Sequence, residues 1–494
     1  MKTRSAIIIG SGVAGMAAAI RLAVQGYAVK VYEKNPQPGG KLNKFEKNGF
    51  HFDTGPSLFT QPQNIEELFE FAGEPIDRYF SYKRIDIACK YFFENGKRVE
   101  AWTNADDLAK ELKEQLNEDS KNTKGYLTRA SKLYNRVGTM FVDHSLQKRK
   151  TWLHKRFFSA LPAVRLAYLF KNLHKYNSRR FSSKEAVQIF DRFATYNGSN
   201  PFKAPAMLSM IPHLEQNTGT FFPRGGMISI VNALYQLAKA KGVQFYFDTA
   251  VERIIHNEGK IRGVVVNQEN EFADIVVSNV DVYFTFDQLL NDSRKVKKIL
   301  KRERSSSAVV FYWGMKKQFP ELQLHNIFFS SDYKKEFSDI FRSRSLSSDP
   351  TIYINITSKA ESDHAPEGKE NWFVMVNAPS DYGQNWEDEK TKLRAAVIGK
   401  LNRMLGTEIS ELIESEDMMD PQMIELQTTS FKGSLYGSSS NSKLSAFLRQ
   451  PNFTSTIKGL YFCGGTVHPG GGIPLCLKSA KIVSELIMKD NKNK

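Results

Sequence analysis

Cysteine and long apolar runs are scarce in this sequence of 494 residues. Its 3 cysteines, Cys89, Cys463 and Cys476, are too few and too widely spaced for a disulfide framework or a cysteine-based metal site. We therefore expect a reducing compartment and no metal. No run approaches the roughly 18 apolar residues of a membrane-spanning helix, and the apolar stretch near the N-terminus fits a first strand rather than a secretory signal.

Acidic residues are missing from the segment 144–184, which contains eleven Lys and Arg residues and much of the net charge of +16. Trp152 and Phe157 recur among these basic residues at roughly helical spacing, and Pro162 is expected to kink the helix. Such a composition is typical of a helix lying in an anionic membrane interface. The alternative is a solvated amphipathic helix packed on the rest of the protein. Nucleic-acid binding is disfavoured, because no reading motif accompanies the charge.

The first thirty-odd residues carry a dinucleotide-binding pattern. An apolar run at 6–9 is followed by Gly10, Gly12 and Gly15, a helix-forming stretch and a second strand that ends at Glu33. The glycines permit a tight turn and close backbone approach, the helix N-terminus favours a pyrophosphate, and the acid is placed for ribose hydroxyls. A glycine-rich turn without a ligand is the alternative, but the strand, the helix and the acid disfavour it. The predicted contacts are Gly10, Gly12, Val13, Ala14, Gly15 and Glu33.

Two more turns follow directly. Residues 34–42 hold two prolines and two glycines, which predict a rigid loop whose amides face the cofactor and whose Lys41 neutralises phosphate; a plain surface turn is the alternative. Residues 55–57 end an apolar strand and predict a donor-bearing turn against the cofactor ring. The predicted contacts are Lys34, Gly40, Lys41, Leu42, Gly55, Pro56 and Ser57.

The C-terminal region repeats the opening arrangement. An apolar strand at 459–463 precedes a glycine-rich turn at 464–476, and a helix is expected from 477 to 488. This predicts a second helix N-terminus aimed at an anion or a flavin edge. Upstream, 227–241 predicts a helix and 242–251 a strand that joins the cofactor sheet. The predicted C-terminal contacts are Gly465, Thr466, Gly472, Ile473 and Pro474.

These motifs together resemble the flavin amine oxidase and phytoene desaturase superfamily, which binds FAD at this fingerprint. The stretches "RFATYNGSNP", "HLE" with "GTFFPRGGM", and "HPGGGIP" resemble the bacterial-type carotenoid desaturases, in the branch that acts on hydroxylated or cyclic-ended carotenoids at the 3,4 position. The resemblance implies that Val251 contacts the adenine end through its backbone. One departure is Ser479-Ala480, where the family usually has Ser-Gly; closer packing is expected there.

The resemblance also implies the architecture. We expect an α/β protein, with a Rossmann-like FAD-binding domain and an interleaved α+β substrate domain of sheet plus helices. The expected segments are FAD-binding parts at 1–90, 221–290 and 431–494, a substrate- and membrane-facing helical region at 91–220, and a substrate domain at 291–430.

The implied reaction removes two hydrogens from a long, water-insoluble polyene, with FAD as the electron sink. Proton loss is expected to involve a weak base or a polarising group. Glu215 and His213 are the first candidates, and Arg192 and Tyr436 are weaker ones. A salt-bridge role for Glu215 and a structural role for His213 are the alternatives, and a hydride-first mechanism needs no dedicated base.

The leading interpretation is an FAD-dependent carotenoid desaturase acting at the 3,4 position of a 1-hydroxylated acyclic end, as on a γ-carotene-type substrate. The resemblance implies a cytoplasmic protein on the membrane surface, with oxygen or a quinone as the electron acceptor. A phytoene- or lycopene-type desaturase and a non-redox polyene isomerase are the alternatives within the fold. The basic charge disfavours a polyamine oxidase, and two intact glycine turns disfavour a binding module without FAD.

Overall fold

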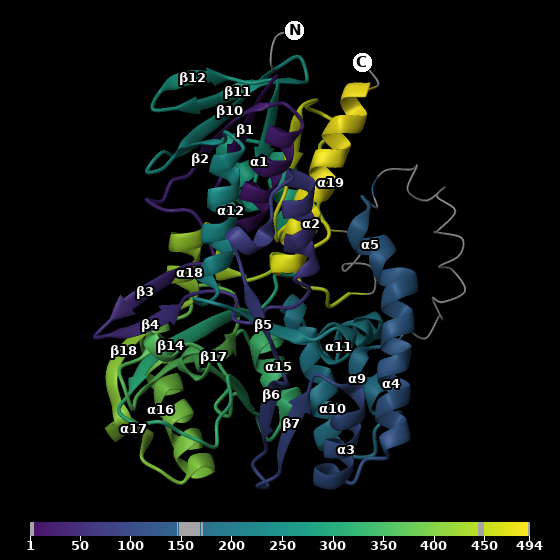
Figure 1. The fold of residues 1–494 in the computed structure, drawn as a ribbon, viewed down its shortest axis with the longest axis vertical. Helices are drawn as coiled ribbons and strands as arrows, with labels where there is room; N and C mark the ends of the chain where they lie inside the picture. The colour runs from purple at the N-terminus through teal and green to yellow at the C-terminus, as the bar shows by residue number, and fades with distance from the viewer. Residues whose placement is uncertain (1–3, 146, 148–167, 169–170, 443–448, 493–494) are drawn as a thin grey trace.

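A computed structural model describes residues 4–145, 147, 168, 171–442 and 449–492 (Figure 1). Most of the basic segment 144–184, with its expected kink at Pro162, therefore lies outside the described residues. None of the described helices is long and apolar enough to cross a membrane.

A parallel sheet of five strands forms the cofactor half of the molecule, at the top of Figure 1. Its order is β19 (Leu460–Phe462), β13 (Ile275–Ser278), β1 (Ser5–Ile9), β2 (Ala28–Tyr32) and β9 (Gln244–Tyr246). Each of these neighbouring pairs is parallel. The strands therefore come from three distant parts of the chain.

Alternation along β1 buries both faces of this sheet. Ala6 and Ile8 pack with α1 (Val13–Val24), α12 (Ile228–Ala240) and α19 (Ile473–Lys492). Ile7 and Ile9 face the other way, against a three-stranded antiparallel sheet. That sheet consists of β10 (Val251–Asn257), β11 (Lys260–Val266) and β12 (Glu269–Phe272). Successive side chains of a strand point to opposite faces, so a strand that is covered on both faces requires apolar residues at consecutive positions.

A mixed sheet of seven strands forms the second half. Its only parallel pair is β15 with β6; the other neighbours are antiparallel. Its strands, in spatial order, are β18 (Ile413–Met419), β14 (Ser307–Met315), β17 (Glu370–Ala378), β16 (Ile352–Asn355), β15 (His325–Phe328), β6 (Ile87–Phe92) and β7 (Arg98–Trp102).

The two faces of the seven-stranded sheet have different covers. Odd-numbered residues of β14 such as Phe311 and Trp313 pack against α16 (Trp386–Leu405). Even-numbered residues such as Ala308 and Val310 face a core that includes the helical lobe at the lower right of Figure 1. The lobe contains α3 (Ala105–Leu116), α4 (Ser120–Leu133), α5 (Thr139–Asp143), α9 (Leu173–Asn177), α10 (Lys184–Asp191) and α11 (Pro212–Gln216).

Short elements connect these layers. The remaining described strands are β3 (Lys44–Lys47), β4 (Phe50–Asp53), β5 (Tyr82–Ile85) and β8 (Thr220–Pro223). The remaining α-helices are α2 (Gln63–Ala72), α13 (Val282–Phe284), α14 (Ser293–Leu300), α15 (Tyr333–Ser338), α17 (Ile409–Leu412) and α18 (Pro421–Thr428). The helix predicted at 227–241 corresponds to α12. The β6 and β7 strands at the start of the predicted helical region 91–220 belong to the seven-stranded sheet.

The predicted α/β class is confirmed, and two predicted boundaries are wrong. The strand expected over 242–251 divides: Gln244–Tyr246 pairs with β2, whereas Val251 begins a strand of the three-stranded sheet. The C-terminal helix begins at Ile473 rather than at 477, so Pro474 lies in its first turn. A first-turn proline is compatible with a helix because the missing N–H would have had no partner there.

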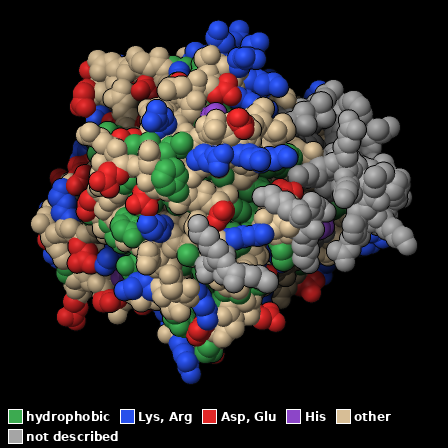
Figure 2. Space-filling view, turned by 90° about the horizontal axis from the view of Figure 1, so that it is seen from above, with side chains coloured by type: hydrophobic (Ala, Val, Ile, Leu, Met, Phe, Trp, Pro, Cys, Tyr) green, Lys and Arg blue, Asp and Glu red, His purple; other side chains and the backbone are tan. Residues whose placement is uncertain are grey.

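Figure 2 shows the molecule from the end that carries the two termini. Basic and acidic side chains are interspersed over the described part of this face. The described side chains of this face therefore do not form one uniformly basic patch.

Candidate functional site

A cavity of about 660 Å³ lies between the five-stranded and seven-stranded sheets. Every predicted cofactor residue except Gly15 lines it, together with two of the four catalytic candidates, Arg192 and Tyr436. The structure therefore brings residues from both ends of the chain to one site. The predicted lining residues are Gly10, Gly12, Val13, Ala14, Glu33, Lys34, Gly40, Lys41, Leu42, Gly55, Pro56, Ser57, Val251, Gly465, Thr466, Gly472, Ile473 and Pro474.

The first glycine turn fits a closely approached phosphate. Gly10 has a φ of 92°, which favours glycine, and Gly12 caps the N-terminus of α1. A Cβ at Gly15 would lie 2.1 Å from the Gly10 carbonyl oxygen, so this position admits only glycine. The first turn of α1 contains no acidic residue, and its N-terminal dipole is available to an anion.

Glu33 is buried beside this turn. Its Oε2 accepts hydrogen bonds from the backbone N–H and the hydroxyl of Ser11, at 2.8 and 2.9 Å. Its Oε1 accepts a hydrogen bond from the backbone N–H of Asn35 at 3.0 Å. The carboxylate therefore fixes the turn while it lines the cavity, and carboxylate oxygens retain lone pairs for a sugar hydroxyl.

Lys41 places a partly buried amine in the cavity wall. Its Nζ donates to the carbonyl of Leu435 at 2.8 Å, and it makes no ion pair with a carboxylate among the described residues. Burial lowers the pKa of Lys41 to about 8, while nearby Asp281 acts in the opposite direction. A nearby anionic ligand would stabilise the protonated form of this amine and raise its pKa again.

Asn279, which the sequence reasoning missed, connects the two glycine turns. Its Oδ1 accepts from the backbone N–H of Gly15 at 2.9 Å, and its Nδ2 donates to the carbonyl of Cys463 at 3.2 Å. It follows β13 directly, at the carboxyl end of a sheet strand. Residues in that position of an open parallel sheet face the ligand crevice, and this is the signal that would have found it.

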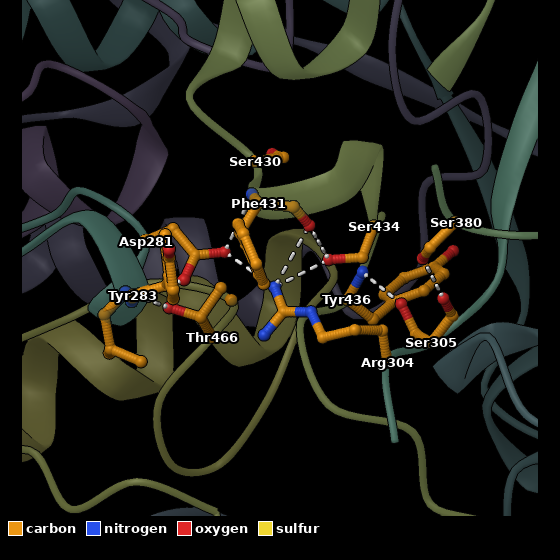
Figure 3. Close-up of polar contacts among 12 residues, drawn as sticks. Asp281, Tyr283, Arg304, Ser305, Ser380, Ser430, Phe431, Ser434, Tyr436 and Thr466 are labelled. Atoms are coloured by element: carbon orange, nitrogen blue, oxygen red, sulfur yellow. Dashed lines mark hydrogen bonds and ion pairs between the residues drawn. The ribbon is translucent and has the colours of Figure 1, made fainter. Parts of the chain in front are cut away.

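A polar cluster fixes the loop that precedes the second glycine turn (Figure 3). Arg304 forms an ion pair with Asp281 at 3.0 Å and donates to the Ser434 hydroxyl at 2.7 Å. Ser305 accepts from the backbone N–H of Tyr436 at 3.0 Å. These contacts, drawn in Figure 3, hold the backbone of Tyr436, a residue that lines the cavity. Burial raises the pKa of Tyr436 to about 12, so the phenol stays protonated.

The other catalytic candidates lie differently. Arg192 lines the cavity and forms a buried ion pair with Glu215, with Nη2 to oxygen distances of 2.9 and 3.2 Å. Glu215 and His213 do not line the cavity. His213 Nδ1 lies 3.0 Å from Nδ2 of Asn217, and burial lowers the pKa of this histidine. Glu215 can therefore reach a bound molecule only through Arg192.

The seven-stranded sheet supplies an apolar wall of the cavity, and none of the residues of this wall was predicted from the sequence. It is contributed by strands β14, β15, β17 and β18, whose inward-facing side chains come from positions far apart in the chain. The lining side chains of this wall include Ala308, Val310, Ile327, Phe373, Met375 and Met419. Such a wall suits a long hydrocarbon ligand.

Comparison with known proteins places this geometry among flavoproteins. A family model described as flavin containing amine oxidoreductase matches residues 13–488. A 1-hydroxycarotenoid 3,4-desaturase from Flavobacterium sp. (strain P99-3) is 47% identical over 489 residues, which cover 99% of this chain and 100% of that protein. A 4,4'-diaponeurosporene oxygenase from Staphylococcus aureus (strain MSSA476) is 31% identical over 490 residues, 98% of each chain.

Solved structures share the fold at low identity. An oxidoreductase from Methanosarcina mazei aligns with a TM-score of 0.66 at 15% identity, over 98% of this chain and 100% of that chain. A putrescine oxidase bound to putrescine aligns with a TM-score of 0.64 at 13% identity, over 99% of each. At such identities the likeness supports the fold alone.

Proposed function

The chain belongs to the flavin containing amine oxidoreductase family, and we propose that it is an FAD-dependent carotenoid desaturase. The proposed reaction forms a C=C bond at the 3,4 position of a 1-hydroxylated acyclic end. The observation that carries the proposal is the single cavity whose glycine-lined part adjoins an apolar wall of the seven-stranded sheet. The identity of 47% to a 1-hydroxycarotenoid 3,4-desaturase supports the choice of substrate.

The residues present fit FAD. Gly10, Gly12 and the start of α1 suit its pyrophosphate, and Glu33 suits its ribose. Lys41 offers a partly buried cation that has no carboxylate partner among the described residues. Val251 lies at the adenine side in this assignment, and the turns at 55–57 and 472–474 lie at the ring side. When bound, FAD supplies the two-electron acceptor that dehydrogenation of an unactivated C–C bond requires.

The chain's own residues position the polyene and exclude water. Apolar side chains of the cavity wall remove the hydrocarbon from water, which is the main source of its binding energy. Arg192, held by Glu215, and Tyr436 are the polar groups proposed to contact the reacting end. Because Tyr436 stays protonated, it acts as a hydrogen-bond donor rather than as a base.

Proton removal is proposed to need no carboxylate base. The carboxylates that line the described cavity, Glu33 and Asp281, already hold the Ser11 turn and Arg304 respectively. Glu215 is neutralised by Arg192 behind the wall. With FAD bound as the two-electron acceptor, loss of hydride before the proton is consistent with this arrangement, because the cationic polyene would then be acidic enough to lose its proton to a neutral oxygen.

The membrane surface and the electron acceptor complete the proposal. A water-insoluble substrate must leave a membrane, and the basic, acid-free segment 144–184 is proposed to contact anionic lipid. Oxygen or a quinone is proposed to reoxidise the flavin. Co-sedimentation with phosphatidylglycerol vesicles but not with phosphatidylcholine vesicles would support the proposed membrane contact. Failure to co-sediment with either kind of vesicle would contradict it.

The deciding experiment is an assay of the purified protein with added FAD and liposome-dispersed carotenoids. Phytoene, lycopene and a 1-hydroxylated γ-carotene are offered in parallel, and product absorbance is followed. A red shift with the hydroxylated substrate alone supports the proposal. A shift with phytoene assigns an earlier desaturation, and a geometric isomer without net oxidation assigns an isomerase. No change with any polyene, despite bound FAD, overturns the proposal.

A further inference from the structure

Four residues form a hydrogen-bonded chain from the cavity into the seven-stranded sheet. The Ser57 hydroxyl lies 2.7 Å from the Tyr353 hydroxyl, which lies 2.8 Å from Nδ1 of His325. Nδ2 of Asn355 lies 3.1 Å from the same Nδ1. Ser57 and Tyr353 line the cavity, whereas His325 and Asn355 are buried behind them.

The direction of every hydrogen bond in this chain follows from its far end. Nδ2 of Asn355 lies 2.9 Å from the carbonyl oxygen of Leu324, which can only accept a hydrogen bond, so the Asn355 atom beside it is the donating amide nitrogen. Its second hydrogen is directed at Nδ1 of His325, which must therefore be the unprotonated ring nitrogen. Burial lowers the pKa of His325 to about 3, in agreement with a neutral ring.

Tyr353 and Ser57 must then both donate inward. An unprotonated Nδ1 can only accept, and its single lone pair is shared by Asn355 Nδ2 at 3.1 Å and by the Tyr353 hydroxyl at 2.8 Å, so the Tyr353 hydroxyl donates its proton to it in the shorter contact. The Tyr353 oxygen accepts in turn, so the Ser57 hydroxyl donates its proton to Tyr353. The Ser57 oxygen makes no other hydrogen bond with the described residues, and its lone pairs remain as acceptors at the cavity wall.

We propose that the Ser57 oxygen accepts a hydrogen bond from the substrate's hydroxyl group and thereby selects a hydroxylated polyene end. This inference rests on the proposed function. In a 1-hydroxylated end, the carbon bearing the hydroxyl is separated from C3 by a single methylene. An acceptor for that hydroxyl must therefore lie beside the cofactor ring, where the turn at 55–57 is proposed to lie.

The arrangement leaves one ring nitrogen of His325 without a partner. Nε2 carries the ring proton in this scheme, and among the described residues it is buried without a hydrogen-bond partner. An unpaired buried N–H destabilises the fold. The unprotonated Nδ1 on the other side of the ring fixes the Tyr353 proton inward, and so keeps Ser57 an acceptor rather than a rotating hydroxyl.

The test compares two substrates that differ only in the hydroxyl. Wild type, Ser57→Ala and Ser57→Thr are each loaded with FAD and given a 1-hydroxylated γ-carotene or the same carotenoid without the hydroxyl. We expect the wild-type kcat/KM preference for the hydroxylated substrate to fall by about tenfold in Ser57→Ala and to recover in Ser57→Thr, as loss of one acceptor predicts. Ser380→Ala, which removes a buried hydroxyl outside the cavity lining, should keep the wild-type preference.

The outcomes separate this inference from the proposed function. If wild type converts no polyene, the proposed function fails. If wild type prefers the hydroxylated substrate and Ser57→Ala keeps that preference while holding FAD, the role of Ser57 is refuted. A changed flavin spectrum in Ser57→Ala with an unchanged preference would show that the oxygen accepts from the cofactor instead, and would also overturn the inference.

Discussion

The side-chain oxygen of Asn279 accepts a hydrogen bond from the backbone N–H of Gly15 at 2.9 Å. The other end of the same amide donates to the carbonyl of Cys463 at 3.2 Å. One side chain at the end of β13 thus joins the first glycine turn to the strand that leads into the second. The two halves of the proposed FAD site are positioned relative to each other through this amide.

Replacement of Asn279 should therefore weaken flavin binding without unfolding the chain. In Asn279→Ala both hydrogen bonds are lost, and we expect the dissociation constant of FAD to rise by about thirtyfold, since the two bonds contribute roughly 1 kcal/mol each. Quenching of flavin fluorescence on titration measures this. Asn385→Ala, which removes an exposed asparagine at the start of α16, is the control. Unchanged FAD affinity in Asn279→Ala would mean that the turns hold their geometry without the amide.

Gly15 and Gly399 offer a matched pair of helical glycines. A Cβ at Gly15 would lie 2.1 Å from the Gly10 carbonyl oxygen, whereas at Gly399 the nearest atom, the end of the flexible Arg403 side chain, is 3.9 Å away. We expect Gly15→Ala to yield protein without bound flavin. Gly399→Ala should keep the flavin and raise the free energy of unfolding by about 0.5–1 kcal/mol, because alanine favours the helix. Absorbance of the purified proteins and thermal unfolding measure the two effects.

If Gly15→Ala retained a full complement of flavin, the backbone would have to move away from the Gly10 carbonyl. The close packing of turn and helix would then be dispensable for cofactor binding.

The sequence was sufficient to predict which residues of the glycine-rich turns line the cavity, because the patterns that mark these turns are local. Strand, turn, helix and acid follow one another between residues 6 and 33, and the pattern repeats near the C-terminus. Adjacent residues in such a unit are adjacent in space. The lining of the cavity by Gly10, Glu33, Lys41 and Pro474 could therefore be anticipated.

The other half depends on pairings between distant parts of the chain. Tyr353 meets Ser57 across 296 positions of sequence, and Arg304 meets Ser434 across 130. No local periodicity encodes such contacts, which depend on strand order in the seven-stranded sheet. Likewise, the proline and glycines at 470–474 indicated a turn, whereas the packing of Ile473 and Leu477 against the core extends α19 through Pro474.

Lys41 should make FAD affinity depend on pH. Burial lowers its pKa to about 8 in the free protein, and an anionic phosphate favours the protonated amine. The proton is present below about pH 8 and is lost above it, so affinity should be full at neutral pH and fall as pH rises. With one linked proton, we expect about tenfold weaker binding at pH 9 than at pH 7.

Two variants test the assignment to Lys41. Lys41→Met should bind FAD weakly at both pH values, so that the affinity no longer depends on pH. Lys41→Arg should keep a positive charge at both pH values, and its affinity should also be independent of pH. Titration of FAD into the apoprotein at the two pH values measures all three proteins. A pH dependence that survives in Lys41→Met would assign the titrating group elsewhere.

Arg192 and Glu215 should be required as a pair for stability. Nη2 of Arg192 lies 2.9 and 3.2 Å from the two carboxylate oxygens of Glu215, and both side chains are buried. Removal of one partner leaves a buried charge unpaired, so Arg192→Met and Glu215→Gln should each lower the free energy of unfolding by about 3 kcal/mol. The double variant Arg192→Met with Glu215→Gln should recover part of that loss, because neither charge remains.

Urea unfolding of the four proteins at one FAD concentration gives the coupling energy, and the polyene assay gives activity. Since Arg192 lines the cavity and Glu215 does not, we expect the double variant to stay poorly active although its stability is partly restored. A different pattern would reassign Glu215. If Glu215→Gln kept wild-type stability and FAD but lost turnover, the carboxylate would act on the substrate directly, after a movement of the wall that separates them.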